Sequence, residues 1–256
     1  MTDVSKTRQV AIHPITSAVR EIVRIFDKLG FSVADGPEIE TDYYNFEALN
    51  FPKDHPARDM QDTFWLPDGR VLRTQTSDVQ IHFMEEHEPP IRIIAPGKVY
   101  RSEATDMKHE AQFYQFEGLV IDEKGKINLG HLKGIVEHFF KEFFGDNTEV
   151  RMRPGFFPFV EPALEFDVRL VGEGVPEKLQ GKWIEVMGSG MVHRNVLSNA
   201  GLDPEKYQGF AFGTGIERLA MMRWMIDDIR NFHHGDMRFV HKFIAELEEA
   251  DKIKDK

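Results

Sequence analysis

The 256-residue sequence contains no cysteine. This absence excludes a disulfide framework and metal sites built from thiolates, and it fits a cytoplasmic protein. No uninterrupted apolar stretch is long enough to span a membrane, and the first residues, MTDVSKTRQ, lack the apolar core of a signal peptide. We therefore expect a cytoplasmic protein with no membrane contact.

Positive charge is also scarce. The chain has 32 Lys and Arg residues against 43 Asp and Glu residues, which gives a formal net charge of −11. Such a balance argues against a surface that binds polyanions in general. If a nucleic acid is a substrate, a local basic patch or a partner chain must hold it. The glycine-rich loops G-x-x-x-x-G-K-[ST] and G-x-G-x-x-G are absent, so neither a P-loop nor a Rossmann fold is expected.

Hydrophobic residues make up 41% of the chain, and its length is ample for one large domain. Helical spacing of apolar residues predicts helices that begin near Pro14, Ser77, Asn128 and Ile216. Short strand candidates, mostly antiparallel in appearance, lie between these helices. This order favours the α+β class. We expect residues 1–12 to form a loose lead-in and residues 13–256 to form a single domain.

Four local patterns carry more detailed expectations. Residues 43–66 lack clear periodicity, which indicates a long ordered loop. Ser77-Asp-Val-Gln80 fits a capping box at a helix start. Gly188-Ser-Gly190 would separate a strand at 183–187 from a helix at 191–200. A last helix is expected from Asp236 to about Glu249.

The segment Lys98–Asp122 has the pattern of two strands joined by a polar loop. Side chains alternate along a strand, so Arg101, Glu103, Gln115 and Glu117 would share one side if the segments fold back on each other. Unpaired buried charge is costly, so such a hairpin is poorly suited to an ordinary core. The groups either form exposed ion pairs on a solvated sheet face or line a polar site.

A second pattern is Gly213-Thr-Gly215-Ile-Glu-Arg218, at the junction of an apolar strand and a helix. Glycines let a backbone approach a ligand closely, and an arginine in the first turn adds charge to the positive end of the helix. The junction is therefore a candidate phosphate site. Alternatively, the glycines serve strand–helix packing and Arg218 is simply exposed to solvent.

Together the two patterns resemble motifs 2 and 3 of the class II aminoacyl-tRNA synthetases, and the first helix with Gly36-Pro37 resembles motif 1. The closest resemblance is to the α subunits of phenylalanyl-tRNA synthetases, from about His13 to Phe243. It rests on ten strings in order: HPI, DGPEIE, NFEALNFPKDHPARD, DTFWL, LRTQTS, GKVYR, HEAQFYQFEGL, FFPFVEP, GSGMVH and GFAFGTGIERLAM. The resemblance implies an antiparallel sheet flanked by helices and an aminoacyl-tRNA ligase activity with ATP.

The resemblance assigns an ATP site to Arg101, Glu103, His109, Phe113, Gly213, Gly215 and Arg218. In this assignment Arg101 and Arg218 are the catalytic residues. Arg101 would bind the α-phosphate and the substrate carboxylate, since a guanidinium can hold two oxygens at once. Arg218 would hold the far phosphates and assist the departure of pyrophosphate.

The resemblance assigns an L-phenylalanine site to Ser77, Gln80, Gln115, Glu117, Phe157, Phe159, Ala211 and Gly213. Glu117 would supply the countercharge for the substrate ammonium. Phe157 and Phe159 alternate across Pro158, so both rings could face the phenyl group, although two aromatics in a core are the more usual case. Ala211 would set the depth of the pocket. For Ser77 and Gln80 the capping box is a competing interpretation.

The resemblance also implies a metal and partners. Glu161 matches a magnesium-binding position whose ligation is shared across a subunit interface, and ATP itself brings Mg²⁺. Partners would be tRNA(Phe) and either a β subunit or a second copy bound through motif 1. The sequence starts almost at motif 1, without the family's N-terminal coiled-coil arm, so we expect a truncated or minimal form.

Two readings from other classes are open at the level of sequence. One is a non-catalytic scaffold that binds partners. The other is a ligase that passes an activated amino acid to an acceptor other than tRNA.

Overall fold

The computed structural model describes residues 12–54, 63–172, 175 and 179–243. The helices are α1 (Pro14–Asp27), the π-helix η1 (Tyr43–Glu47), α2 (Ser77–Glu86), α3 (Leu129–Phe144), α4 (Arg194–Asn199), α5 (Ile216–Trp224), the 3-10 helix η3 (Ile229–Phe232) and α6 (Met237–His241). The strands are β1 (Ser32–Val33), β2 (Ile39–Glu40), β3 (Val71–Leu72), β4 (Ile91–Tyr100), β5 (Gln112–Glu123), β6 (Thr148–Pro154), β7 (Val160–Leu170), β8 (Ile184–Val192) and β9 (Tyr207–Gly215). None of the helices in these ranges is both long and apolar enough to cross a membrane.

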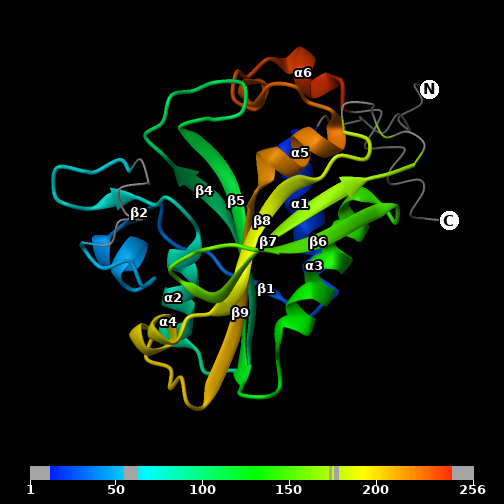
Figure 1. The fold of residues 1–256 in the computed structure, drawn as a ribbon. Coiled ribbons are helices and arrows are strands. Elements are labelled where there is room, and N and C mark those ends of the chain that lie inside the picture. The colour runs from blue at the N-terminus through cyan, green and yellow to red at the C-terminus, as the bar shows by residue number, and fades with distance from the viewer. Residues whose placement is uncertain (1–11, 55–62, 173–174, 176–178, 244–256) are drawn as a thin grey trace, which may run out of the picture.

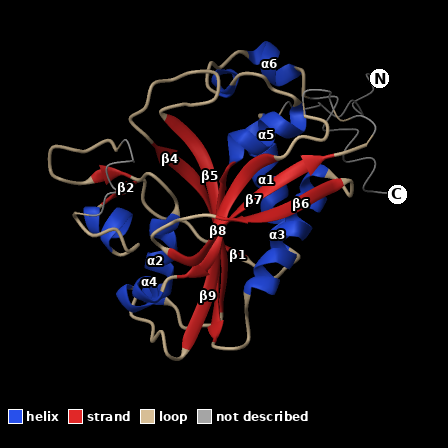
Figure 2. Ribbon diagram, in the orientation of Figure 1, coloured by secondary structure: helices blue, strands red, loops and turns tan. Residues whose placement is uncertain are grey.

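A seven-stranded sheet runs through the molecule in the order β1-β4-β5-β9-β8-β7-β6 (Figure 2). Every neighbouring pair is antiparallel except β1 and β4, which are parallel. The short strands β2 and β3 form a separate antiparallel pair. The predicted α+β class with an antiparallel sheet is therefore confirmed.

Helices cover both faces of this sheet, with α1, α3 and α5 on one face and α2 and α4 on the other (Figure 1). Alternation along β5 divides the core between the faces. Phe116 and Val120 pack with the first group of helices, whereas Leu119 and Ile121 pack with the second. Glu117 shares the parity of Leu119, so the chain places this carboxylate on the α2 face.

Local signals set the ends of the first helix. Its N-terminal cap is His13, whose ring accepts a hydrogen bond from the backbone N–H of Ile15, and Pro14 occupies the first turn. After the helix, Gly30 has a φ of +77°, a conformation that suits glycine. The sequence predicted these limits because proline and glycine act locally.

Several local expectations were wrong. Residues 43–47 of the expected loop form η1, and 55–62 lie outside the described residues. Gly188-Ser-Gly190 lies inside β8 rather than after it, and the following helix starts only at Arg194. The reason is close packing: a Cβ on Gly188 would lie 2.8 Å from the ring of Phe157, and one on Gly190 would lie 2.4 Å from the carbonyl oxygen of Pro162.

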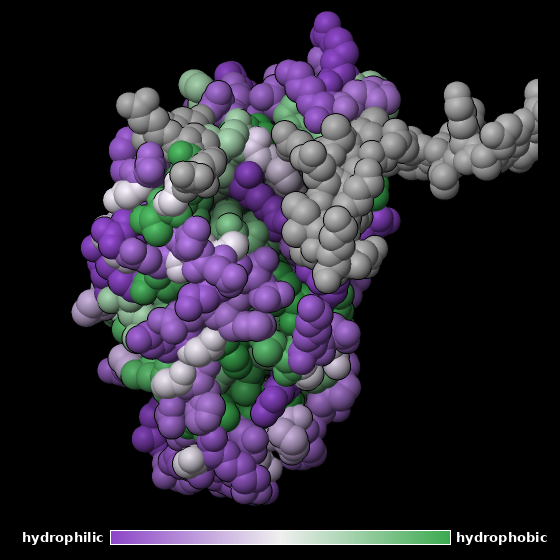
Figure 3. All heavy atoms as spheres, turned by 90° about the vertical axis from the view of Figure 1, so that its right-hand side faces the viewer, coloured by the Kyte–Doolittle hydropathy of each residue, from purple (hydrophilic) through white to green (hydrophobic). Residues whose placement is uncertain are grey.

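The last predicted helix is shorter within the described residues, where α6 ends at His241 and residues 244–256 are not described. On the side of the molecule that carries β6 and α3, the surface is mainly hydrophilic, with hydrophobic residues gathered toward its middle (Figure 3). The polar groups that the sequence singled out lie elsewhere, in a cavity on the α2 face.

Candidate active site

A cavity of about 980 Å³ opens on the α2 face of the sheet. Its walls come from β5, β8, β9, the loop after β4, the turn before β7 and the starts of α2 and α5. The predicted residues that line it are Ser77, Gln80, Arg101, Glu103, His109, Phe113, Gln115, Glu117, Phe157, Phe159, Ala211, Gly213, Gly215 and Arg218. Residues that are far apart in the sequence therefore converge on one space of the size that small ligands occupy.

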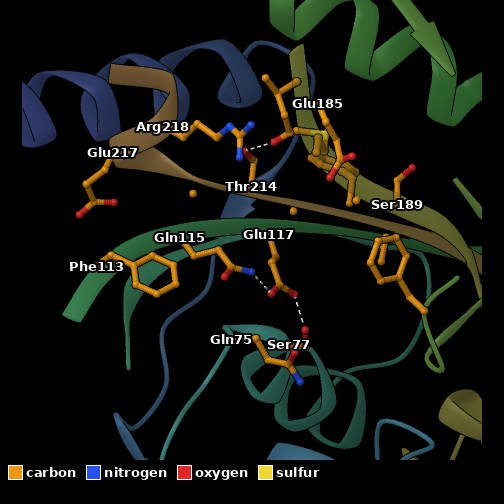
Figure 4. Close-up of a pocket in the computed structure, with 18 of the residues that line it drawn as sticks. Gln75, Ser77, Phe113, Gln115, Glu117, Glu185, Ser189, Thr214, Glu217 and Arg218 are labelled. Atoms are coloured by element: carbon orange, nitrogen blue, oxygen red, sulfur yellow. Dashed lines mark hydrogen bonds between the residues drawn. The ribbon is translucent and has the colours of Figure 1, made fainter. Parts of the chain in front are cut away.

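Glu117 is the buried carboxyl group of this cavity. Its Oε1 accepts hydrogen bonds from the backbone N–H of Thr76 at 3.2 Å and from Gln115 Nε2 at 2.5 Å. Its Oε2 accepts from Ser77 Oγ at 2.5 Å and from Gln80 Nε2 at 2.7 Å. In Figure 4 the carboxyl group lies between Gln115 and Ser77. All four donors are neutral, so a cationic ligand would meet no competing charge from them.

Burial raises the pKa of Glu117 to about 7, and the hydrogen bonds from Ser77 and Thr76 work in the opposite direction. Removal from water disfavours the charged form, whereas donors that point at the carboxylate favour it. The group is consequently close to half-ionised near neutral pH. A bound ammonium would favour the ionised form further.

The capping-box interpretation of Ser77 and Gln80 was wrong. Thr76 is the N-terminal cap of α2, and no side chain makes a capping hydrogen bond there. Ser77 and Gln80 direct their side chains to Glu117 instead. Sequence spacing could not separate the two cases, because both require a polar residue in the first helical turn.

Arg101 lies just after β4, in the loop that joins β4 to β5. Its guanidinium carbon lies 5.1 Å from the centroid of the Phe113 ring, and its Nε is buried without a hydrogen-bond partner among the described residues. Burial lowers the pKa of Arg101, and the charges of Glu103 and Glu117 raise it. A buried cationic donor without a partner is suited to an anionic ligand.

The rest of the loop carries Glu103 and His109. Both line the cavity, and His109 Nδ1 lies 2.9 Å from Asp106 Oδ2. The loop is joined to the C-terminal part of the chain, since the backbone N–H of Ile229 donates to the carbonyl oxygen of Met107 at 3.1 Å. The position of His109 is therefore fixed by contacts within and beyond the loop.

Phe157 and Phe159 form an apolar wall at 5.8 Å between ring centroids, with an angle of 22° between the rings. They flank Pro158, and both line the cavity, as the sequence predicted. They belong to a turn before β7, in which the N–H of Val160 donates to the carbonyl oxygen of Phe157. The turn still presents both rings to the cavity.

β9 forms the floor of the cavity. Ala211 pairs with Leu119 on one side and Gly190 on the other, and it is buried. A Cβ on Gly213 would lie 2.6 Å from Cγ of Glu117. Only a residue without a side chain lets Glu117 lie across β9 here.

At the start of α5 the two glycines differ. Around Gly215 a Cβ would meet no atom within 4 Å, so packing does not require this glycine. Arg218 is exposed, lines the cavity, and makes no ion pair or hydrogen bond with the other described residues. Both observations fit the phosphate site better than the packing interpretation.

The sequence reasoning missed Gln75, Glu185 and Glu217, which also line the cavity. Both carboxylate oxygens of Glu217 accept from the backbone N–H of Tyr114, at 2.8 and 2.9 Å. Burial raises the pKa of Glu217 to about 8. Its hydrogen-bond donor Tyr114 is 103 residues away in the chain, so no local pattern of the sequence indicated this role.

Glu161 is the one predicted site residue that is not in the cavity lining. Its side chain is 79% exposed, and its Oε2 lies 3.5 Å from Nε2 of His193. Within the described residues, no group of three His, Asp or Glu side chains is arranged to hold a metal ion. The chain's described residues alone do not fit a complete magnesium site at Glu161.

The sequence matches the profile of the "tRNA synthetases class II core domain (F)" over residues 2–243. The chain belongs to this family. It is 54% identical over 234 residues to the phenylalanine–tRNA ligase alpha subunit of Caldanaerobacter subterraneus subsp. tengcongensis, covering 90% of this chain and 68% of that protein. The same subunit of Bacillus subtilis is 52% identical over 236 residues, with the same coverage. These relatives place this class II synthetase chain among the phenylalanine–tRNA ligase α subunits.

The fold comparison agrees with this family. The crystal structure of pyrrolysyl-tRNA synthetase from Desulfitobacterium hafniense matches with a TM-score of 0.66 at 17% identity. The match covers 86% of this chain and 73% of that one. At such low identity the likeness concerns the fold, and it confirms the expected class II synthetase architecture.

Proposed function

We propose that this chain is the catalytic part of a phenylalanine–tRNA ligase, which activates L-phenylalanine with ATP and transfers it to tRNA(Phe). The observation that carries the proposal is one cavity with three distinct regions. Glu117 and its donors suit an ammonium, Phe157 and Phe159 suit a phenyl ring, and the two arginines suit phosphates.

In the proposed activation step a carboxylate oxygen of phenylalanine attacks the α-phosphorus of ATP. A new O–P bond forms as the bond to pyrophosphate breaks, which gives phenylalanyl-adenylate and pyrophosphate. Arg101 would hold the substrate carboxylate and the α-phosphate, and it would stabilise the charge that builds up on the transferring group. Glu103, His109 and Phe113 would contact the nucleotide, near the backbone of Gly213 and Gly215.

Arg218 would hold the far phosphates, because it is exposed in the cavity and has no ion-pair partner among the described residues. Mg²⁺ bound to ATP would neutralise phosphate charge in this reaction. No step is assigned to a metal at Glu161, since the described residues do not form a complete site there.

The proposed partners are ATP, L-phenylalanine, tRNA(Phe) and a β subunit, or a second copy that binds near the turn at Gly36-Pro37. The proposed location is the cytoplasm, where charged tRNA is used. The non-catalytic scaffold is not favoured, because Arg101, Glu117 and Arg218 are all present and all line one cavity.

The test is phenylalanine-dependent exchange of pyrophosphate into ATP, measured with the full chain alone and with a β subunit. We expect exchange that depends on phenylalanine and is lost in Arg101→Ala. A chain that supports no exchange in either form contradicts the proposed catalysis. Exchange with the β subunit but without charging of tRNA(Phe) would limit the function to activation.

A further inference from the structure

Arg73 is a buried arginine next to the cavity, but it does not line it. Its side chain is 2% exposed. Nε donates to the carbonyl oxygen of Lys98 at 2.8 Å, and Nη1 donates to the carbonyl oxygens of Gly36 at 3.2 Å and Pro37 at 3.3 Å. One guanidinium therefore fastens the Gly36-Pro37 turn to β4.

Asp78 completes this arrangement from the first turn of α2. Its Oδ2 lies 3.8 Å from Nη1 of Arg73, and its side chain has no exposed surface. Among the described residues, neither oxygen of this carboxyl group has a hydrogen-bond partner. Burial raises the pKa of Asp78 to about 8, against the lowering effect of Arg73. Near pH 7 this carboxyl group is therefore mostly neutral, and the guanidinium of Arg73 is the neighbouring cation that opposes the shift.

β4 is shaped to admit the guanidinium. A Cβ on Gly97 would lie 2.2 Å from Nη2 of Arg73 and 3.3 Å from Cγ2 of Thr76. Glycine in the middle of a strand is unfavourable unless another group must approach the backbone. Gly97 pairs directly with Gln115, which is one of the donors to Glu117. Arg73 and Asp78 therefore pack next to the residues that donate hydrogen bonds to Glu117.

The chain of contacts reaches Glu117 through one helical turn. Asp78 lies between Ser77 and Gln80 in the first turn of α2, which begins after Thr76. Thr76, Ser77 and Gln80 supply three of the four hydrogen bonds to Glu117. A displacement of this turn relative to β4 and β5 would alter all three bonds at once.

We propose that the Arg73–Asp78 pair is a positioning device for the amino-acid ammonium site, which it serves by holding the first turn of α2 against β4. The inference rests on the proposed function, because it assigns the ammonium of phenylalanine to Glu117. Burying two ionisable side chains together is rarely the most stable choice, since apolar residues of similar volume often do as well or better. Its benefit here is geometric.

The test compares variants behind the site in the pyrophosphate exchange assay, using the full chain with its β subunit. Arg73→Met/Asp78→Leu removes both buried polar side chains together, so neither partner stays buried without the other, and we expect the fold to be retained. Arg73→Lys keeps one charge but lacks the fork that reaches several acceptors at once. We expect both variants to raise the KM for phenylalanine by about tenfold and to change the KM for ATP by less than about twofold.

Gly97→Ala tests the same device from the other side, because its methyl group would displace the guanidinium. It should raise the KM for phenylalanine in the same direction, whereas the control Gly134→Ala should not. Gly134 lies in α3, where a Cβ would meet no atom within 4 Å. Thermal unfolding of each variant separates loss of fold from loss of position.

The outcomes are distinct. If the double variant unfolds at wild-type temperature but has a raised KM for phenylalanine alone, the pair positions the site. If KM values for both substrates change in parallel, or neither changes, the pair is merely structural and the inference is overturned. A wild-type chain that shows no phenylalanine-dependent exchange instead overturns the proposed function, and this inference with it.

Discussion

Glu117 should make phenylalanine binding depend on pH. Burial raises the pKa of its carboxyl group to about 7, so below that pH the group is mostly neutral and offers no countercharge to an ammonium. Above it, the group is ionised and binding is strong. We expect the KM for phenylalanine in pyrophosphate exchange to fall by about tenfold between pH 6 and pH 8, as the competent fraction rises.

Two comparisons isolate this effect. The KM for ATP should not follow the same curve, because the nucleotide does not meet Glu117. In Glu117→Gln the KM for phenylalanine should be high at every pH in this range, since the amide carries no charge. A wild-type KM for phenylalanine that is flat from pH 6 to pH 8 would refute the ammonium assignment.

Ala211 should limit the length of the amino-acid side chain that the cavity accepts. It is buried in β9 and lines the cavity together with Phe157 and Phe159. Ala211→Gly removes a methyl group, so activation of a para-halogenated phenylalanine should improve by about tenfold relative to phenylalanine. Competing exchange assays measure this ratio.

The matched control is Ala163→Gly. Ala163 lies in β7 and pairs with Gly190, as Ala211 does, but it does not line the cavity. Its substitution should leave the preference for phenylalanine unchanged. If Ala211→Gly discriminates as the wild type does, another residue sets the depth of the pocket.

At the scale of elements, the sequence predicted those limits of helices and strands that residues close in the chain determine. The ends of α1 follow from Pro14 and Gly30, and β9 with α5 follows from an apolar run that leads into Gly215. The limits of β8 could not be predicted, because Gly188 and Gly190 make room for residues of the turn before β7 and of β7 itself. The residues that require these glycines, Phe157 and Pro162, lie about thirty residues earlier in the chain.

The same limit applies to the site. Resemblance to a family supplied most of the predicted site residues, and alternation along β5 supplied Gln115 and Glu117. The roles of Arg73 and Glu217 depend on contacts with Gly36, Lys98 and Tyr114, which no local pattern reveals. Side chains that bind distant backbone groups look like ordinary charges in a sequence.

Glu217 should hold α5 in register with β5. Its carboxyl group accepts from the N–H of Tyr114, beyond the last β5–β9 pair at Gln115 and Gly215. Glu217→Ala would leave that N–H without its partner and free the turn that carries Arg218. We expect the KM for ATP to rise by about tenfold, with a smaller change in the KM for phenylalanine.

Glu217→Gln should behave almost like the wild type at pH 7. Because burial raises the pKa of Glu217 to about 8, the neutral carboxyl group predominates at that pH, and an amide oxygen can accept the same hydrogen bond. Steady-state exchange kinetics of both variants decide the matter. Equal losses in Glu217→Gln and Glu217→Ala would show that the ionised carboxylate is required.

For the whole molecule, Arg223 joins the three helices α1, α3 and α5. From α5, its Nη1 donates to the carbonyl oxygen of Phe143 in α3 at 2.7 Å and lies 2.6 Å from Oε2 of Glu21 in α1. The guanidinium also lies 4.7 Å from the centroid of the Phe143 ring. These contacts tie together helices that are widely separated in the chain.

Arg223→Met should therefore lower stability without changing the selectivity of the site. Loss of charge-assisted hydrogen bonds at a largely buried position should cost about 1–3 kcal/mol of unfolding free energy. For a chain of this size, the cost corresponds to a fall of roughly 3–10 °C in the melting temperature. Because Arg223 does not line the cavity, KM values for both substrates at 25 °C should match the wild type.

Arg238→Met is the matched control for this prediction. Arg238 also pairs with a carboxylate, that of Asp236, but its side chain is 90% exposed, and surface ion pairs contribute little. Its melting temperature should stay within about 1–2 °C of the wild type, since substitutions at such sites cost at most about 0.5 kcal/mol. If both variants melt together with the wild type, the three helices are held by apolar packing alone, and Arg223 is dispensable for the fold.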